Sequence, residues 1–392
     1  MTWLKTVGKK FLHDYQKIID PKKEYWDGVN LLMKDVQYAM VYSERTSGKT
    51  FFFQGLIIYN YHKRNKKTVY LVRVDKNITK SKLGDMFNVF VPYITKLTDG
   101  VFNNVKYYGG RFYLCRTDGG KIVEEASEPF MTVLALNVQD STKSVFNDNN
   151  VDIIWFEEFM TRERYLTDEF LKFQGMISTV VRLRDDVQVI MTANTVNRFC
   201  PYFAEMGLTN VRTQQQGTID VYSYGSSDLH VAVEYTEEME KAGRKKPSNV
   251  YFAFDNPRLE MVKTGAWEIA SYPHPPWHTS GDETIVDDIW LCLDDVIIRG
   301  CINYNERLGF VYMLWQPTDK HDVKDILIKD TTVVYMDTTP ITGNHFFYLQ
   351  GKLAKQIMGL AKNDRLYYSD NTVGEVFNSF LKKMQNCSII RG

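Results

Sequence analysis

The chain has 392 residues, which is too long for one small domain and suggests two or three. Its composition, 44% hydrophobic and 24% charged, is ordinary for a folded protein with a sizeable core. The 48 basic and 48 acidic residues cancel, which excludes nucleic-acid recognition by a global basic field and leaves only local basic patches.

The cysteines and the apolar runs indicate the cellular compartment of the protein. The five cysteines are scattered without a Cys-x-x-Cys pair, which argues against a zinc site or a disulfide scaffold and fits a reducing cytoplasm. No apolar run is long enough to span a bilayer, and Lys9 and Lys10 interrupt any signal-peptide core. We therefore expect a cytosolic protein that makes no membrane contact.

The first half of the chain indicates an α/β fold. Residues 1–35 predict helices, and short apolar runs then alternate with helical segments, as in a parallel sheet covered on both faces. The predicted strands are 36–42, 68–74, 151–156 and 187–192. Between the second and third of them, Gly109-Gly110 predicts a two-residue hairpin that joins strands 105–108 and 111–115.

The composition changes after about residue 205. We expect a P-loop domain over 1–205, a linker or small intermediate domain over 206–283 and a third part over 284–392. In the third part an antiparallel meander is predicted, followed by further elements. The predicted segments are strands 296–303, 309–315 and 332–336, a helix at 346–360, a strand at 365–368 and a helix to about 384.

The segment Ser43-Glu44-Arg45-Thr46-Ser47-Gly48-Lys49-Thr50 carries the strongest chemical signal. A strand, a tight loop ending in Gly-Lys-Thr and an apolar helix are the layout of a phosphate-binding P-loop. Lys49 would reach the β- and γ-phosphates, and the Thr50 hydroxyl would ligate Mg²⁺. Ser43 stands where a P-loop usually has its first glycine. The alternative interpretation of the segment is a turn that carries a surface lysine.

Paired acids end the third predicted strand, at Glu157 and Glu158. This is the Walker B arrangement, in which the first acid holds the Mg²⁺ shell and the second polarises an attacking water as general base. Glu157 replaces the usual aspartate and is one methylene longer, so we expect a displaced or water-mediated metal contact. The alternative is a strand end capped by solvated glutamates.

Two further polar residues belong to the fourth predicted strand. Asn194 ends it and would lie beside the P-loop, where an amide can orient water and sense the γ-phosphate, unless it only forms a turn. Arg182 precedes it and could stabilise the transition state of phosphoryl transfer, in cis or from a neighbouring subunit. The alternative for Arg182 and Arg184 is a surface salt bridge to Asp185 or Asp186.

In this order the motifs resemble the genome-packaging ATPases of small tailed phages (podophages), which are compact relatives of terminase large subunits. The resemblance is good over 36–205 and patchy beyond. An arginine within the P-loop, here Arg45, is a marked trait of the group. Besides the P-loop, the resembling segments are 69–73, 110–113, 154–159, 179–182 and 194–203, with a weaker one at 334–338.

The resemblance implies a P-loop ATPase domain of the ASCE type with a parallel sheet, and a C-terminal α+β domain like RNase H. It implies a homo-oligomeric ring, usually a pentamer, on the portal of an empty procapsid in the host cytoplasm. There the ring would drive double-stranded DNA inward using ATP and Mg²⁺. Whether a packaging RNA lies between ring and portal stays open.

Roles carried over by position complete the predicted site. Glu158 activates water, Arg182 is the arginine finger given to the next subunit, and Asn194 is the sensor that couples hydrolysis to movement. Two lysines match less closely: Lys143 as a subunit-interface residue and Lys76 as a DNA-facing residue.

The C-terminal domain is expected to be a vestigial nuclease. A two-metal nuclease needs clustered carboxylates. Asp370 would follow the later strand, but Asn303 stands on the first strand of the meander where a metal-binding aspartate would be, and Asp337 could simply cap a turn. The alternatives for the whole chain are a terminase large subunit with an active nuclease and a nucleotide-gated nucleic-acid-binding scaffold.

Overall fold

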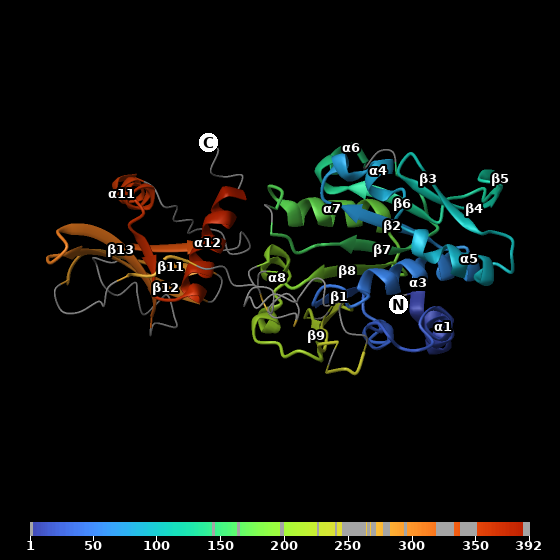
Figure 1. Cartoon of the computed structure of the whole chain (residues 1–392), viewed down its shortest axis with the longest axis horizontal. Coiled ribbons are helices and arrows are strands. Elements are labelled where there is room, and N and C mark those ends of the chain that lie inside the picture. Colours follow the sequence, from blue (N-terminus) through green and yellow to red (C-terminus); the bar gives the residue numbers. More distant parts are fainter. Residues whose placement is uncertain are drawn as a thin grey trace. The chain divides into compact units, whose positions relative to one another are not determined.

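The structure is a computed structural model, and it forms two compact units (Figure 1). The described residues are 3–142, 146–162, 165–196, 200–225, 227–239, 241–244, 264, 267, 272–276, 283–293, 296–318, 333–337 and 351–386. The first unit comprises Met1–Arg198 and Leu208–Trp267, and the second comprises Phe199–Gly207 and Glu268–Gly392. Across the described residues, no helix is long and apolar enough for a membrane span.

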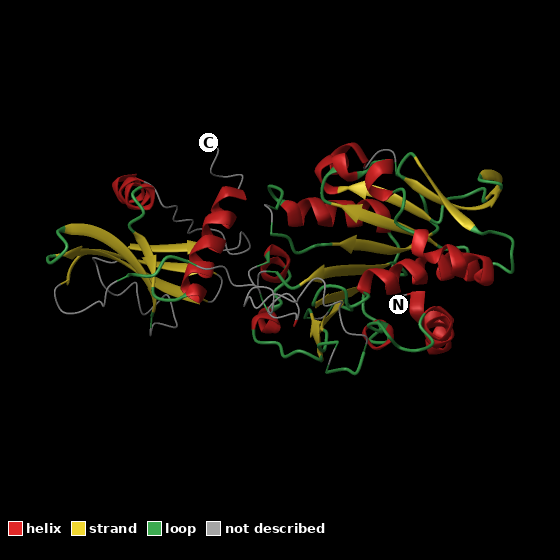
Figure 2. Ribbon diagram, in the orientation of Figure 1, coloured by secondary structure: helices red, strands yellow, loops and turns green. Residues whose placement is uncertain are grey.

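A ten-stranded sheet forms the centre of the first unit, with helices on both faces (Figure 2). Its helices are α1 (Trp3–Ile19), α2 (Val29–Leu32), α3 (Lys49–Arg64), α4 (Lys80–Leu83), α5 (Val91–Leu97), α6 (Gln139–Thr142) and α7 (Glu169–Val181). Its strands are β1 (Tyr38–Ser43), β2 (Lys67–Val72), β3 (Asn104–Tyr108), β4 (Arg111–Asp118), β5 (Lys121–Glu125), β6 (Met131–Ala135), β7 (Val151–Glu157), β8 (Gln188–Asn194), β9 (Thr218–Ser223) and β10 (His230–Tyr235).

The strand order confirms the predicted parallel sheet. The strands follow one another as β3-β4-β6-β2-β7-β8-β1-β10-β9, with β5 beside β4. All four predicted strands (β1, β2, β7 and β8) lie together and are parallel, with β8 inserted between β7 and β1. The predicted hairpin is also present, since β3 and β4 pair antiparallel and Gly109 and Gly110 both have positive φ.

The first unit extends further along the chain than predicted. Strands β9 and β10 belong to its sheet, so residues 218–235 are neither a linker nor a separate domain. β10 pairs in parallel with β1, with Tyr38 opposite Val231 and Tyr42 opposite Tyr235. A pairing between strands almost 200 residues apart leaves no local signal in the sequence, and β9 is a half-exposed edge strand.

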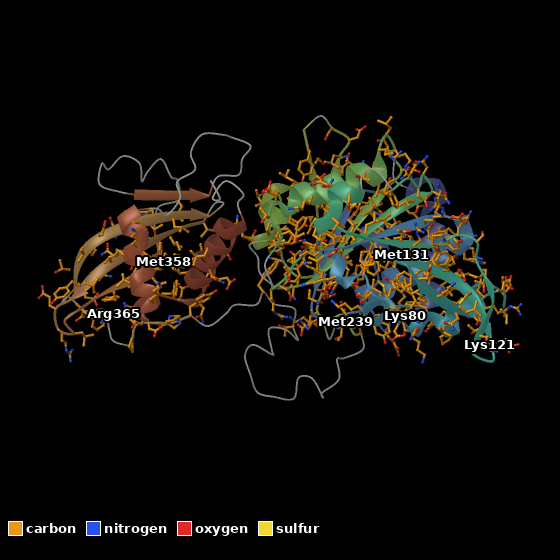
Figure 3. The ribbon with its side chains drawn as sticks, turned by 90° about the horizontal axis from the view of Figure 1, so that it is seen from above. Lys80, Lys121, Met131, Met239, Met358 and Arg365 are labelled. Carbon is orange, nitrogen blue, oxygen red and sulfur yellow. The ribbon has the colours of Figure 1, made fainter. Side chains whose placement is uncertain are left out.

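Helix α3 follows the loop after β1 and packs against the core of the sheet. It begins after Gly48 and ends at Asn65, both in the left-handed conformation, at φ 97° and φ 53°. Phe52 and Phe53 are buried against Trp26 and Trp155. On the other half of the sheet Met131 of β6 is fully buried, while Lys121 is exposed at the tip of the β4–β5 hairpin (Figure 3).

The second unit is an α+β domain built on a five-stranded sheet. Its described elements are α8 (Pro201–Glu205), β11 (Glu283–Leu293), β12 (Val296–Asn305), β13 (Phe310–Pro317), β14 (Val333–Asp337), α11 (Gly351–Lys362), β15 (Leu366–Tyr368) and α12 (Asn371–Asn386). The strand order is β14-β11-β12-β13-β15. Trp315 of β13 packs on Phe377 of α12, with ring centroids 4.6 Å apart.

Two predictions for this unit were wrong in detail. The meander is β11-β12-β13, so its first strand begins at Glu283, before the predicted one. The segment expected as its third strand, β14, instead pairs in parallel with β11. Acidic residues interrupt the apolar run of β11, whereas β14 is a short apolar run that ends in Asp337. Such local patterns do not show the direction of pairing.

A buried ion pair fastens α3 to the sheet and gives a stability prediction. Asp152 is fully buried at the start of β7, where it accepts hydrogen bonds from Arg64 and from Asn60 (2.9 Å). Asp152→Ala should lower the free energy of unfolding by about 3–5 kcal/mol, because it leaves a guanidinium beside an emptied, desolvated position. Urea-induced unfolding measures this.

The control is an exposed ion pair of the same sheet. Glu128, whose side chain is 59% exposed, contacts Lys67 at 2.8 Å. Glu128→Ala should change the free energy of unfolding by at most about 1 kcal/mol. Equal losses in the two variants would contradict a structural role for the buried pair.

Candidate nucleotide-binding site

A pocket lies at the edge of the sheet where β1, β7 and β8 end. Because parallel strands point the same way, the segments that follow them meet at one edge. The pocket has a volume of about 310 Å³. It is lined by residues 46–51 of the P-loop and α3, by Glu157 at the end of β7 and Glu158 after it, and by residues 192–194 of β8.

The loop before α3 has the backbone that a phosphate-binding loop needs. Gly48 has φ 97°, and a Cβ at this position would lie 2.6 Å from Cβ of Tyr25. Glycine is therefore required both by its conformation and by the space available. The loop leads into the first turn of a 16-residue helix, whose N–H groups have no partners within the helix and favour an anion.

The unusual Ser43 has a structural role in this loop. Its side chain is buried, and its hydroxyl contacts the Ser47 hydroxyl (2.7 Å) and donates to the Glu44 carbonyl (2.7 Å). It also accepts a hydrogen bond from Lys49. The departure from the usual leading glycine therefore provides a partner for the lysine and does not destroy the loop.

Lys49 is buried among oxygen atoms that carry no formal charge. Its ammonium donates to Ser43, to the Glu44 carbonyl (3.2 Å), to Ser47 Oγ (3.2 Å) and to Asn194 Oδ1 (3.3 Å). Burial lowers the pKa of Lys49 to about 7, although Glu157 and Glu44 oppose the shift. A buried ammonium with only neutral hydrogen-bond partners favours the arrival of an anion.

Thr50, Glu157 and Tyr70 form a chain of hydrogen bonds at the pocket wall. The Thr50 hydroxyl donates to Glu157 Oε1, and the Tyr70 hydroxyl donates to Oε2 at 2.8 Å. Burial raises the pKa of Glu157, which the two hydrogen bonds partly oppose. The longer Glu157 thus reaches Thr50 directly, and these hard oxygen atoms suit Mg²⁺.

Glu158 lies in the same pocket but in a different environment. Its side chain is exposed and its backbone is left-handed, with φ 57°. Its carbonyl accepts hydrogen bonds from both terminal nitrogens of Arg73, each at 3.2 Å. An exposed carboxylate that lines the pocket can act as a base toward a water molecule there.

Asn194 lies where the sequence predicted, at the end of β8. In the sheet it is opposite Ser43, and its amide oxygen accepts the hydrogen bond from Lys49. The next residue, Thr195, donates from its backbone to the Ser43 carbonyl at 2.9 Å. Asn194 therefore contacts the P-loop lysine through its side chain.

Arg45 and Arg182, the two arginines expected near phosphate, lie at different edges of the sheet. Arg45 is exposed in the P-loop itself. Arg182 follows α7 and precedes β8, so it lies at the opposite edge of the sheet from the pocket, about 20 Å away along a seven-residue strand. Its guanidinium donates to the Phe146 carbonyl at 3.0 Å. Within one chain Arg182 does not reach the pocket.

The remaining predicted residues have different outcomes. Arg184 contacts Asp186 (3.7 Å) and the carbonyls of Asn149 and Val180 (3.0 Å each), so for this arginine the salt-bridge alternative holds. Lys76 is exposed after β2, at the same edge as the pocket. Lys143 lies outside the described residues.

The predicted nuclease residues do not come together. Asp370 accepts a hydrogen bond from Val373 N (2.9 Å) and so caps α12. Asn303 is buried on β12, the second strand of the meander, opposite Tyr312, whereas Asp370 lies beyond the pair of Tyr368 with Trp315. Among the described residues, no group of three or more Asp, Glu, His or Cys side chains could hold a metal ion.

Sequence reasoning missed two side chains that shape the site. Tyr70 and Arg73 belong to β2 and the residues after it, and they hold Glu157 and the Glu158 carbonyl. Glu44, which belongs to the predicted P-loop segment, is buried, and its carboxylate accepts a hydrogen bond from Met239 N at 2.7 Å. Polar residues at the end of a strand next to the acidic strand were the available signal for Tyr70 and Arg73.

Fold and site together define a P-loop nucleotide-binding protein in which one strand separates the P-loop strand from the acidic strand. The chain belongs to the family of the Podovirus DNA encapsidation protein (Gp16), whose family model matches residues 20–246. No curated protein matches the chain significantly.

The chain is also similar to solved structures. The bacteriophage Phi-29 viral genome packaging motor assembly is 18% identical, with a TM-score of 0.51 over 92% of this chain and 100% of that chain. The Phi-28 gp11 DNA packaging motor is 17% identical, with a TM-score of 0.46 over 93% and 98%. The first of these likenesses shows a shared fold.

Gly48 provides the first test of the site. Gly48→Ala should abolish measurable nucleotide binding, because the new Cβ would collide with Tyr25 and the residue would have to leave its left-handed conformation. Fluorescent-nucleotide titration measures the affinity. Gly120 is a matched control, since it has φ +79° but nothing within 4 Å of its Cβ position. A Gly120→Ala variant that lost binding equally would contradict the steric argument.

Tyr70 provides a test of the metal side of the pocket. Tyr70→Phe removes the hydrogen bond to Glu157 Oε2 and leaves that oxygen without its phenol partner. The Mg²⁺ concentration needed for half-maximal nucleotide binding should rise roughly fivefold to tenfold, the worth of about 1 kcal/mol. Tyr61→Phe is the control, because its hydroxyl bonds the Glu128 carbonyl away from the pocket. Equal Mg²⁺ requirements in both variants would argue against the role of Tyr70.

Proposed function

We propose that this chain is the ATPase of a viral DNA packaging motor, which drives double-stranded DNA into a preformed procapsid as a ring on the portal. The observation that carries the proposal is the division of the catalytic groups. Lys49, Thr50 and Glu158 line one pocket, whereas Arg182 lies at the far edge of the same sheet. Membership of the DNA encapsidation family supports the substrate and the setting.

The residues of the pocket fit ATP with Mg²⁺. The buried ammonium of Lys49 would pair with the β- and γ-phosphates, and the first turn of α3 would donate its N–H groups to them. The Thr50 hydroxyl and the Glu157 carboxylate would hold Mg²⁺ directly or through water. When bound, the metal ion neutralises charge on the phosphate oxygens.

The remaining groups in the pocket supply the steps of hydrolysis. Glu158 would accept a proton from the attacking water, since its exposed carboxylate lines the pocket. Asn194 contacts Lys49 and would change partners as the γ-phosphate leaves, which makes it the sensor. Arg45, exposed in the loop over the pocket, would add positive charge near the phosphates.

A neighbouring subunit would complete the site. Arg182 has a positive φ (53°) with ψ −116°, which turns the chain sharply after α7. Leu183, directly beside it, is 100% exposed, although a leucine normally gains from burial. An arginine finger flanked by an exposed apolar side chain suits a heterologous subunit contact, and such contacts close into rings. Five subunits would match the family resemblance.

Further partners are proposed for an exposed lysine and for the second unit. DNA contacts in a packaging ring should go mainly to phosphates, because any sequence must be accepted, and the exposed Lys76 is a candidate for them. The second unit would be a vestigial nuclease that binds the portal, DNA or a packaging RNA. Its proposed loss of cleavage is supported by the capping role of Asp370 and the separation of Asn303 from it.

Mixing two inactive variants tests the division of the site. Glu158→Gln should lower ATP turnover at least roughly 100-fold, and Arg182→Ala should lower it at least roughly 1,000-fold. Mixed in equal amounts, they should recover turnover at about one quarter of the subunit interfaces, where an intact base meets a neighbour's intact arginine. ATPase rates with double-stranded DNA measure this.

Size-exclusion chromatography and circular dichroism serve as the controls for folding and assembly. Unchanged turnover in Glu158→Gln would contradict the assigned base. Two inactive variants that stay inactive when mixed, although they assemble together, would contradict hydrolysis completed by a neighbour.

A further inference from the structure

Arg73 connects three parts of the first unit that the hydrolysis scheme treats separately. It follows β2, and its side chain is only 15% exposed. Its Nε donates to both carboxylate oxygens of Glu169, at 3.1 and 2.9 Å. Its terminal nitrogens donate to the carbonyls of Glu158 (3.2 Å) and Phe159 (3.0 Å).

The contact with Glu158 fixes an unfavourable backbone. A glutamate at φ 57° is strained, because its Cβ approaches a carbonyl oxygen, and such conformations persist only when the surroundings determine them. Arg73 donates hydrogen bonds to the two successive carbonyls at this turn, those of Glu158 and Phe159. The guanidinium fork can serve both carbonyls and a carboxylate at once, which a lysine ammonium cannot do with the same geometry.

The contact with Glu169 reaches a rigid helix. Glu169 is the first residue of α7, it is buried, and it also accepts a hydrogen bond from Leu166 N at 2.7 Å. The helix spans 13 residues, about 20 Å, and it packs on the sheet through Phe173 and Met176, both fully buried. The helix ends at Val181, and Arg182 follows directly. A displacement of Glu169 would therefore move the residue that precedes Arg182.

We propose that Arg73 is a positioning residue that couples the backbone of Glu158 to helix α7. The general base of one site and the arginine given to the neighbouring site then change position together. The inference rests on the proposed function, since it requires that Arg182 acts in the next subunit. Turnover in one pocket would alter the Glu158–Phe159 backbone, and Arg73 and Glu169 would pass the shift along α7 to the neighbour.

The complementing pair of variants allows the two effects of Arg73 to be measured separately. In the mixture, the Arg182→Ala chain supplies the working base and the Glu158→Gln chain supplies the working arginine. Arg73→Lys is added first to the base-supplying chain and then to the arginine-supplying chain. The first arrangement reports on Glu158, and the second reports only on what reaches Arg182 through α7.

We expect turnover to fall in both arrangements. The loss should be roughly tenfold to a hundredfold when the chain with the working base carries the change, because misplacement of a catalytic group is costly. The loss of turnover should be roughly threefold to tenfold when the chain with the working arginine carries Arg73→Lys. A loss of this size is usual for a mutation that weakens the coupling between two sites. Nucleotide affinity and the circular dichroism spectrum at the assay temperature should stay unchanged, whereas a general loss of structure would alter both.

Arg184→Lys is the matched control, since Arg184 also bonds backbone carbonyls but at the opposite edge of the sheet. It should leave turnover unchanged in both arrangements. If Arg73→Lys does not fold, Glu169→Gln replaces it, because that change weakens the link to α7 and leaves the carbonyl contacts in place. With either variant, a loss confined to the base-supplying chain would overturn the coupling and leave the proposed motor intact. A parent mixture without recovered turnover would overturn both.

Discussion

The burial of one ammonium group organises the site. Lys49 is taken out of water and held only by the oxygens of Ser43, Ser47, Glu44 and Asn194 that carry no formal charge. Removing a charge from water is unfavourable without an opposite charge, and burial accordingly lowers its pKa to about 7. In the proposed function the phosphates of a bound nucleotide would provide this opposite charge. The strand order makes this possible, because β1 and β8 deliver Ser43 and Asn194 to the same edge.

The same sheet divides the chemistry between its two edges. The P-loop, Glu157 and Glu158 follow strands at the carboxyl edge, whereas Arg182 precedes β8 at the other. With Glu158 as the proposed base and Arg182 as the proposed finger about 20 Å away, the site would be completed only by assembly. Helix α7 spans this separation, and the ion pair between Arg73 and Glu169 anchors it beside the base. In the proposed function α7 would therefore link assembly to hydrolysis, as a motor whose subunits act in order requires.

Short runs of residues were enough to predict the features that depend only on neighbouring residues in the sequence. The P-loop, the paired acids after β7 and Asn194 follow from short runs of residues, and all of them line or contact one pocket. The hairpin at Gly109-Gly110 follows from turn chemistry. Strand β10 could not be predicted, because its partner β1 is almost 200 residues away. Tyr70 and Arg73 were missed for a related reason, since only the neighbouring positions of β2 and β7 give their polar groups a target.

The central claim is that hydrolysis requires neighbouring subunits and serves DNA movement. Steady-state ATP hydrolysis, followed across protein concentration with and without double-stranded DNA, tests it most directly. The account predicts a rate that rises more steeply than linearly with protein concentration and increases further when DNA is present. A rate strictly proportional to protein concentration and indifferent to DNA would mean that each chain hydrolyses ATP alone, which contradicts the account.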